Sequence, residues 1–450
     1  MEPLSGVKGM QTVDLNVTNA KIFTRGRFVE AGISIEADRI YKIAKAANLP
    51  KASETINAGS NVVLPGLIDA HVHLRDLGLK YKEDFFTGTC AAAAGGFTTV
   101  LDMPNTVPPT NTPERLKEKI QRAEKQTIIN VGFYAALPSQ YEQFKEMIEN
   151  GAIAFKIYLS HPLTELDLRR DDILLEVFKR VKQLNRPVAV HAEDGAEIQR
   201  KEEKFRKSGK TRLEHFLKAH TAETEVNAVQ RVLNLAKQVG VQLHFCHISA
   251  AKSLELVKNA GPQITCEVTP HHLFLTTADL HRQGRIALTD PPVRSPLNAF
   301  KLWRGLDEGT TDILASDHAP HALKEKQREN IWEVPPGIPG LETTLPLILT
   351  QVNRGQVSWS QLIQLLAVKP AEIFRLNRGS IREGGFADLV IVDAHKEYKI
   401  EAEKFHSKAK YSPFDGWKVK GKPIKTFVNG RLIMDEGEIV AKRGTGQIMR

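Results

Sequence analysis

Cysteine is scarce in this chain, and its distribution excludes two kinds of site. Only 3 of the 450 residues are cysteine, namely Cys90, Cys246 and Cys266, and no Cys-x-x-Cys pair occurs. A disulfide framework needs an even set of cysteines, and a thiolate zinc site needs closely spaced ones. We therefore expect neither. We interpret Cys246 and Cys266, which lie in apolar runs, as buried thiols without a chemical role.

Long apolar runs are also missing. No uninterrupted stretch approaches the roughly 20 residues that a membrane-spanning helix needs. Residues 1–8 lack the charged-then-apolar pattern of a secretory signal. Hydrophobic residues make up 41% of the chain and charged residues 26%, as in ordinary globular proteins. We expect a cytoplasmic protein that makes no contact with membranes.

Acidic residues are outnumbered, and the net charge is +9. The densest basic run, residues 201–212, nevertheless contains Glu202 and Glu203 and has no accompanying stripe of aromatic residues. This pattern predicts a solvated helix or loop and argues against nucleic-acid binding. A basic surface favours encounter with small anionic substrates.

The middle of the chain alternates strand-like and helix-like segments. The strand-like runs are residues 62–70, 98–102, 128–136, 153–158, 187–191, 241–247, 264–269 and 313–316. Helix-compatible segments between them include residues 112–125, 171–184, 222–239 and 295–306. Eight strand–helix units over roughly 250 residues predict a closed, parallel (β/α)₈ TIM barrel. The rival, a doubly wound open sheet, would carry a glycine-rich turn after its first strand, and none is present.

Both ends of the chain are rich in strand patterns. Residues 31–44 carry a hairpin signal at Asp38-Arg39, and residues 424–433 carry one at Asn429-Gly430. We predict an α/β protein in which residues 1–62 and 379–450 together form a small β-sandwich-like domain around a barrel of residues 63–378. Two separate edge hairpins are the alternative for the ends.

A His-x-His pair follows the first barrel strand. His71 and His73 come directly after the apolar run of residues 61–68. Alternate residues of a strand share one face, so the two imidazoles should project together. Two converging imidazoles form half of a site for a divalent transition metal such as zinc. A single His-x-His motif more often consists of two surface histidines. The residues at the other strand ends therefore decide whether a metal site is present.

Those ends carry the remaining ligands of a two-metal centre. The active site of a barrel lies where its strands end, and the polar residues there are Asn105, Lys156, His191, His247, Asp317 and His321. Taken alone, Lys156 would more often face outward, and each histidine would more often be structural. His244, at an odd offset from His247, should point to the opposite strand face as a structural histidine.

Lys156 gives the proposed centre its bridge. Burial and nearby dications favour a neutral amine, which can react with carbon dioxide to form a carbamate. We expect His71, His73 and Asp317 to hold one metal, His191 and His247 to hold the other, and the carbamate of Lys156 to join them. A hydroxide shared by two such metals is nucleophilic near neutral pH.

Together these segments resemble the amidohydrolase superfamily and, within it, the dihydroorotases with a carboxylated lysine. The matching motifs are residues 65–75, 103–106, 155–159, 190–193, 246–249, 268–273, 315–321 and 336–342, in that order. The resemblance implies the reversible cyclisation of N-carbamoyl-L-aspartate to (S)-dihydroorotate, a step of pyrimidine (UMP) biosynthesis. It also implies two divalent ions, with zinc as the first expectation, and a homodimer.

The resemblance further assigns roles to residues around the metals. Asp317 is expected to act as the general acid and base. Arg75, Asn105 and His321 are expected to bind the substrate carboxylate, and a loop containing Pro336 and Gly337 should cover the site.

One position departs from the pattern. Where many bacterial members have Asn-Pro-Pro-Leu-Arg, this chain has Asp290 before Pro291. We keep Asp290 as a substrate-binding residue, because a backbone contact would tolerate the carboxylate whereas an inward side chain would repel an anion.

Two other functions remain open. An allantoinase or dihydropyrimidinase would share the metal site but acts on substrates without this carboxylate. A non-catalytic partner of aspartate transcarbamoylase is the third reading, although such family members lack several ligands that this chain keeps. The sequence does not decide whether an aspartate transcarbamoylase associates with this protein.

Overall fold

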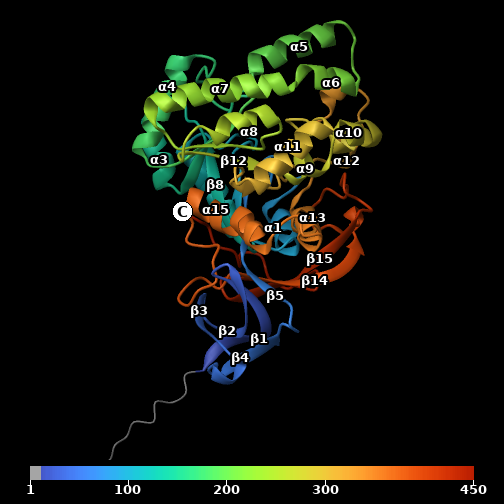
Figure 1. The fold of residues 1–450 in the computed structure, drawn as a ribbon. Helices are drawn as coiled ribbons and strands as arrows, with labels where there is room; N and C mark the ends of the chain where they lie inside the picture. The colour runs from blue at the N-terminus through green and yellow to red at the C-terminus, as the bar shows by residue number, and fades with distance from the viewer. Residues whose placement is uncertain (1–11) are drawn as a thin grey trace, which may run out of the picture.

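The computed structural model describes residues 12–450, which form two connected parts (Figure 1). An eight-stranded parallel sheet wrapped by helices forms the larger part, and a nine-stranded mixed sheet forms the smaller one. Residues 1–8, in which the sequence shows no signal pattern, lie outside the described residues. Among residues 12–450, every helix is too short or too polar to cross a membrane.

The barrel strands lie side by side in chain order. They are β6 (Leu67–Val72), β7 (Phe97–Asp102), β8 (Asn130–Ala136), β9 (Ala152–Tyr158), β10 (Val188–His191), β11 (Leu243–Phe245), β12 (Ile264–Val268) and β13 (Ile313–Leu314). The segment after β13 returns to β6, where the His73 amide donates to the His318 carbonyl at 2.8 Å. The predicted (β/α)₈ barrel is therefore confirmed as a nearly closed one.

Helices connect and surround these strands. They are α1 (Phe85–Ala94), α2 (Pro113–Glu124), α3 (Gln143–Glu149), α4 (Asp171–Gln183), α5 (Gly195–Lys207), α6 (Leu213–Ala219), α7 (Ala222–Val239), α8 (Ala251–Lys258), α9 (Pro270–Phe274), α10 (Thr277–Gln283), α11 (Pro296–Asp307), α12 (Leu323–Lys326), α13 (Leu341–Asn353), α14 (Trp359–Ile363) and α15 (Lys369–Ile373). Short turns are η1 (Ala46–Asn48), η2 (Gly284–Ala287), η3 (Ile331–Glu333), η5 (Ala402–Lys404) and the π-helical η4 (Gln364–Val368). Helix α2 begins as its sequence predicts, with Thr112 as the cap and Pro113 as the first helical residue.

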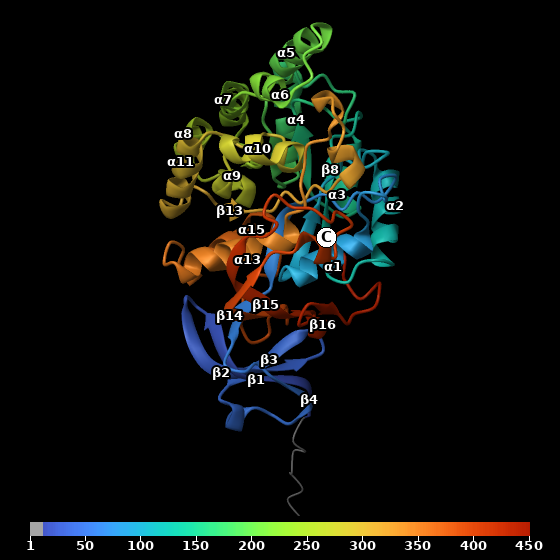
Figure 2. The same cartoon turned by 90° about the vertical axis from the view of Figure 1, so that its right-hand side faces the viewer.

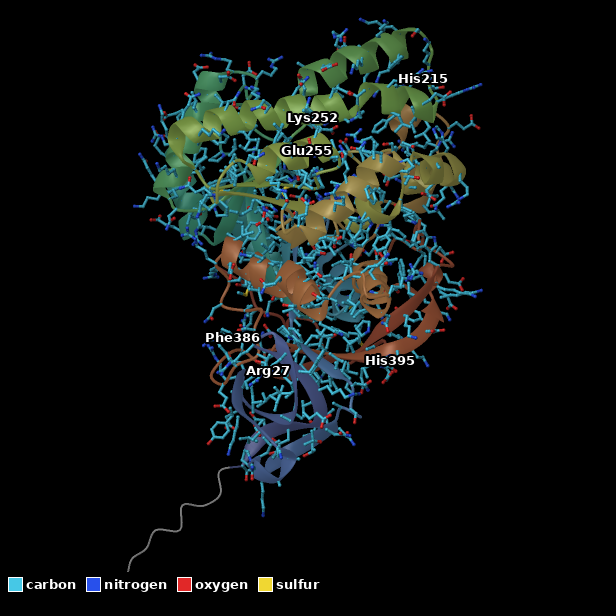
Figure 3. All side chains as sticks on the ribbon, in the orientation of Figure 1. Arg27, His215, Lys252, Glu255, Phe386 and His395 are labelled. Carbon is cyan, nitrogen blue, oxygen red and sulfur yellow. The ribbon has the colours of Figure 1, made fainter. Side chains whose placement is uncertain are left out.

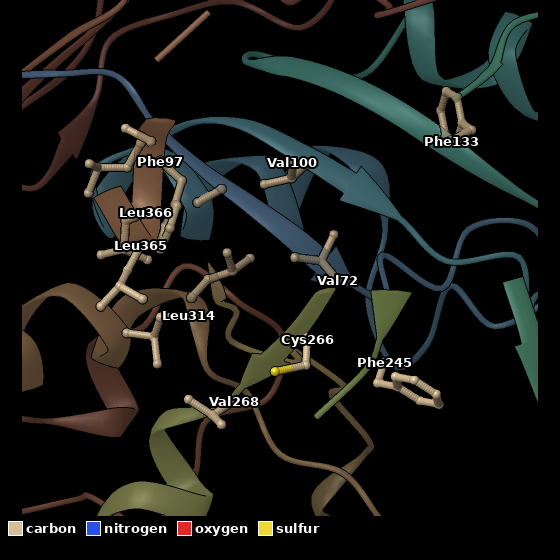
Figure 4. Close-up of a cluster of buried hydrophobic side chains, with 14 of the residues drawn as sticks. Val72, Phe97, Val100, Phe133, Phe245, Cys266, Val268, Leu314, Leu365 and Leu366 are labelled. Atoms are coloured by element: carbon tan, nitrogen blue, oxygen red, sulfur yellow. The ribbon is translucent and has the colours of Figure 1, made fainter. Parts of the chain in front are cut away.

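The main core lies between the strands and the surrounding helices. Figure 4 shows Val268 and Leu314 from neighbouring strands close to Leu365 and Leu366 of η4, all within one buried cluster. Each such side chain contributes about 1.5–3 kcal/mol on burial. Inside the barrel, Phe374 packs edge-on against Tyr134 with ring centroids 5.6 Å apart. Phe374, which follows α15, belongs to a buried cluster with Ile68 and Leu101 of the barrel strands.

The small sheet combines strands from both ends of the chain. Its members are β1 (Val13–Thr24), β2 (Arg27–Glu36), β3 (Arg39–Ala44), β4 (Ala52–Asn57), β5 (Val62–Pro65), β14 (Leu389–Lys399), β15 (Lys418–Val428), β16 (Arg431–Asp435) and β17 (Glu438–Ile439). Strand β5 pairs with β1 on one side and with β14 on the other, which joins the two halves. Figure 2 shows β14, β15 and β16 between the N-terminal strands and the helices of the barrel. The composite β domain is confirmed, as one mixed sheet.

Two turns and one break in this sheet follow from local sequence. Asn429 and Gly430 join β15 to β16 with φ values of 50° and 78°, as a two-residue hairpin turn requires. The turn between β2 and β3 lies at residues 37–38, one residue earlier than the sequence suggests. Gly66 divides the first apolar run, because β5 belongs to the small sheet and β6 begins the barrel.

An aromatic ring connects the small sheet to the barrel. Phe386 lies between two guanidinium groups, with Arg39 at 3.5 Å and Arg378 at 3.2 Å from its ring centroid. Figure 3 labels Phe386 beside the N-terminal strands, where they meet the rest of the molecule. Arg378 also pairs with the buried Asp388 at 3.4 Å. Cation–π contacts of this kind, partly shielded from water, help to fix the small sheet against the barrel.

Candidate metal centre

A β-bulge aims the first two histidines into the barrel. The pairing of β6 with β7 changes register between Asp69 and Val72, so that β6 contains one extra residue there. Before the bulge, Ile68 and Ala70 belong to the cluster inside the barrel. After it, His71 and His73 turn inward and are 1% and 6% exposed. A bulge re-aims a side chain in this way, so the simple alternation of a strand does not apply.

Neighbouring acceptors orient both rings. Nδ1 of His71 contacts the Glu267 carboxylate, and Nδ1 of His73 lies 2.6 Å from Oδ1 of Asn105. A proton on each Nδ1 satisfies these contacts and leaves Nε2 with a free lone pair. Both Nε2 atoms face Oδ1 of Asp317, at 3.4 Å for His71 and 3.1 Å for His73.

A second pair of histidines lies next to the first. Nδ1 of His191 is 3.1 Å from Nε2 of His247. The ring centroids of His247 and His71 are 5.2 Å apart, and His73 lies beside His71. The four imidazoles therefore form one continuous group. Nδ1 of His247 is buried and has no hydrogen-bond partner among the described residues. Converging ring nitrogens with unused lone pairs repel one another, and a bound cation would relieve that repulsion.

Lys156 lies inside the barrel beneath this group. Its side chain is 1% exposed, and its Nζ is 2.9 Å from Sγ of Cys246 and 4.8 Å from the centroid of the Tyr158 ring. Among residues 12–450, it has no carboxylate within ion-pair distance. Cys246 is buried as expected, and its sulfur accepts a hydrogen bond from Lys156 Nζ.

Burial favours the neutral form of three of these imidazoles, those of His71, His73 and His247. Burial lowers the pKa of His71, and it lowers the pKa of His73 and of His247 well below the usual range. Burial raises the pKa of Asp317, although His71 and Lys156 act in the opposite direction. Neutral imidazoles offer lone pairs to a metal, because a protonated ring nitrogen cannot ligate.

These side chains fit a metal centre of nitrogen and oxygen donors. His71, His73 and Asp317 bring three ligand atoms within 4.8 Å of one another, and so do His191, Glu193 and Asp290. Imidazole and carboxylate donors at such separations suit zinc or a similar divalent ion. A third set joins His71 to Cys246 and Glu267, but the Glu267 carboxylate already bonds His71 and the His247 amide.

All of the predicted site residues except Lys156 line one cavity of about 300 Å³ at the carboxyl end of the barrel. Alongside the metal-ligand candidates, its wall includes Arg75, Asn105, Asp290, His321, Pro336 and Gly337. Sequence reasoning did not single out Tyr158, which also lines this cavity. The cavity is large enough for a small substituted ring.

One end of the cavity is cationic. The Arg75 guanidinium lies 3.1 Å from Nε2 of His321, and Lys82 Nζ lies 3.0 Å from Nδ1 of the same ring. An ammonium has no acceptor, so Nδ1 of His321 accepts from Lys82, and the proton on Nε2 points to the Pro336 carbonyl oxygen at 3.0 Å and not to the guanidinium. Lys82 was not predicted, because nothing in its local sequence connects it to His321.

Asp290 directs its side chain to a buried histidine. Its Oδ1 is 3.1 Å from Nδ1 of His220. Burial disfavours a charge on His220, yet Asp290, Glu193 and Glu202 raise the pKa of His220 well above its usual value. The imidazolium therefore compensates the Asp290 carboxylate and weakens the repulsion that we expected for an anionic ligand. No local sequence signal marks His220 for this role.

His244 corrects another expectation. It lies inside the barrel, with Nε2 3.0 Å from Glu267 and Nδ1 2.9 Å from Thr265, and not on the face opposite to His247. Strand β11 ends at Phe245, and His247 has a φ of 34°, so the period of two stops before His247. The expectation of a hydrogen-bonded structural histidine agrees with these contacts.

Glu267 holds three elements of the centre together, although sequence reasoning did not select it. Its buried carboxylate bonds His71, His244 and the amide of His247, and the pKa of Glu267 is lowered by both histidines despite the opposing effect of burial.

We expect Glu267→Gln to weaken metal affinity by about 10- to 100-fold, because an amide orients His71 less strongly. Competition with a chelator would measure this. Glu255→Gln on the exposed face of α8 (Figure 3) should leave affinity unchanged, and equal affinities in both variants would contradict the role.

Comparisons with known proteins agree with this geometry. The family model described as the amidohydrolase family matches residues 62–433. A dihydroorotase of Methanothermobacter thermautotrophicus is 38% identical over 436 residues, covering 96% of each chain. An L-hydantoinase of Paenarthrobacter aurescens is 33% identical, covering 97% of this chain and 98% of its own. The solved L-hydantoinase (dihydropyrimidinase) from Arthrobacter aurescens is 32% identical and superimposes with a TM-score of 0.92 over 97% of this chain and 99% of its own.

Proposed function

The chain belongs to the amidohydrolase family and is a metal-dependent cyclic amidohydrolase, and from that premise we propose that it is a dihydroorotase. It would interconvert N-carbamoyl-L-aspartate and (S)-dihydroorotate. The observation that carries this proposal is the cationic end of the cavity, where Arg75 and His321 lie beside the ligand group. A carboxylate beside the reacting ring is what distinguishes dihydroorotate from the simpler cyclic amides.

The proposed ligands divide into two sets joined by Lys156. His71, His73 and Asp317 would hold one divalent ion, and His191 and His247 the other, with a carbamate on Lys156 between them. When bound, such ions supply an activated water and polarise the ring carbonyl. Zinc is the proposed metal because neutral imidazoles and carboxylate oxygens are among its preferred ligands.

Asp317 is proposed to move the proton. In ring opening, its carboxylate accepts a proton from the attacking water and gives it to the departing ring nitrogen. In ring closure, the steps reverse, and Asp317 begins protonated. Its burial supports this role, because the same burial that raises the pKa of Asp317 makes the protonated form accessible.

The remaining residues are proposed to bind and orient the substrate. Asn105 accepts from His73 through Oδ1, which leaves its amide hydrogens free to donate to a carboxylate. His321 would donate through Nε2 in place of its contact with the Pro336 carbonyl oxygen, because Lys82 occupies its Nδ1. Arg75 can bind the same carboxylate through two parallel hydrogen bonds. Asp290, Pro336 and Gly337 would complete the wall around the substrate.

The test is a comparison of substrates on the zinc-loaded protein. We expect turnover of dihydroorotate and of carbamoyl aspartate to exceed that of hydantoin and dihydrouracil by orders of magnitude. A second candidate, ring opening of hydantoins or dihydropyrimidines, is favoured by the likeness to the L-hydantoinase. Efficient turnover of those rings without turnover of dihydroorotate would establish the second candidate in place of the first.

Arg75→Met should lower kcat/KM for dihydroorotate by about 100-fold or more, because the substrate carboxylate would enter a buried cavity without its guanidinium partner. Metal content should stay unchanged, since Arg75 is not among the proposed ligands. Arg200→Met, on the exposed surface of α5, is the matched control. If Arg75→Met keeps the activity of the control, the assignment of the carboxylate to this end of the cavity is wrong.

We also propose that the protein acts in the cytoplasm as a homodimer, which the family resemblance supports. Light scattering on the purified protein would give the mass of the assembly. Mixing with an aspartate transcarbamoylase before the same measurement would test that association.

A further inference from the structure

A buried lysine near the cavity has no role in the proposed chemistry. Lys326 ends the short helix α12 and is 1% exposed. Its Nζ donates to three backbone carbonyl oxygens, those of Leu288 at 3.1 Å, Pro335 at 3.2 Å and Gly337 at 3.0 Å. An ammonium has three hydrogens, so each one has an acceptor.

This lysine is held by carbonyl oxygens and not by an acid. The adjacent Glu325 directs its carboxylate to Lys82 at 3.2 Å and to the Tyr81 hydroxyl at 2.9 Å. Burial lowers the pKa of Lys326 to about 7, so the charged form is costly here. An apolar side chain of similar length would fill the same space without that cost. The three hydrogen bonds are what a lysine adds.

The three carbonyls belong to two segments of the cavity wall. Leu288 lies two residues before Asp290, and Pro335 and Gly337 flank Pro336. The Gly337 amide also donates to the Leu288 carbonyl at 2.8 Å, so the two segments bond to each other where Lys326 binds them.

Gly337 allows the close approach that this arrangement needs. Its φ is 133°, and a Cβ at this position would lie 2.4 Å from the Ala319 carbonyl oxygen. The neighbouring Pro336 carbonyl lies 3.0 Å from Nε2 of His321. The backbone of residues 335–337 is therefore packed against the end of the cavity that is proposed to bind the carboxylate.

We propose that Lys326 is a positioning residue that clamps the wall segments 288–290 and 335–337 together and thereby sets the affinity for the substrate. It acts through backbone carbonyls and touches neither the metals nor the reacting atoms. The identity of the substrate rests on the proposed function, but the clamp itself does not. Its loss would let both segments move and would weaken binding more than chemistry.

Lys326→Met is the decisive variant, because methionine keeps most of the volume and removes all three donors. We expect the KM for dihydroorotate to rise about tenfold, as the loss of buried hydrogen bonds implies, with kcat within about threefold of the wild type. Metal content should not change. Amide hydrogen exchange should accelerate in residues 288–290 and 335–337. Lys326→Gln keeps two N–H donors and should raise KM less. Lys324→Met, exposed on the same helix, should match the wild type.

Several results would overturn the clamp. One is an unchanged KM with unchanged exchange in folded Lys326→Met. Another is a fall in kcat and metal content at constant KM, since that would make Lys326 a support of the metal centre only. If Lys326→Met does not fold, Lys326→Gln decides by the same measurements. If the wild type opens hydantoin and not dihydroorotate, the proposed substrate fails, and KM for hydantoin together with hydrogen exchange still tests the clamp.

Discussion

Asp317→Asn should lower kcat by about a thousandfold or more while the protein remains folded. An amide can neither accept the proton of the attacking water nor return it to the ring nitrogen, and general acid–base catalysis alone is worth about 10²–10⁴-fold. The same change replaces a carboxylate ligand by a weaker neutral oxygen. Asp317 has a φ of 45°, and asparagine tolerates the left-handed region well, so the backbone should keep its path.

Steady-state kinetics and metal analysis of the zinc-loaded variant would measure this loss. Asp307→Asn, at the exposed end of α11, is the matched control and should retain full activity. Metal content reports the role of Asp317 as a ligand, and the pH profile of kcat reports its role in proton transfer. If the variant keeps its metals and its wild-type rate, another group must transfer the proton.

Lys156→Met should abolish activity, with a loss of about a thousandfold or more, and should reduce the bound metal. Methionine has nearly the same volume but no nitrogen that can take up carbon dioxide, so the anionic bridge cannot form. The four imidazoles and Asp317 would then carry too little negative charge for two dications.

The melting temperature separates this effect from misfolding. Lys156 is buried without a carboxylate partner among residues 12–450, so an apolar substitute should leave the metal-free protein as stable as the wild type, or more stable. Metal uptake by the wild type should also increase with added bicarbonate. Lys252→Met, exposed on α8 (Figure 3), provides the control. A fully active Lys156→Met enzyme would rule out the bridge.

Much of the fold could be predicted from local pattern, because the barrel strands are buried on both faces along most of their length. Such strands appear as apolar runs, and eight of them separated by helices leave few architectures. The boundary near Gly66 could not be found in this way. The run that contains β5 and β6 is continuous in sequence, and only pairing with distant β14 shows that its first half belongs to the other sheet.

The candidate site divides along similar lines. Histidines, Lys156 and Asp317 at strand ends could be selected because the barrel brings these ends together. The direction of His244 could not, since the backbone at His247 breaks the alternation. Glu267 was the missed signal: an acid inside an apolar strand, as unusual there as Lys156. The pairing of His220 with Asp290 and the three carbonyls around Lys326 depend on long-range contacts that no local pattern encodes.

The pairing of β5 with β14 has a consequence for folding during synthesis. During synthesis, residues 62–65 leave the ribosome more than 300 residues ahead of their partners at 389–392, and until then one hydrogen-bonding edge of β5 stays bare. Such an edge invites pairing with another chain, and contacts so distant in sequence form slowly. Overexpression or refolding at high concentration should therefore produce aggregates, or dimers that exchange strands of the β domain, under conditions in which the barrel still folds.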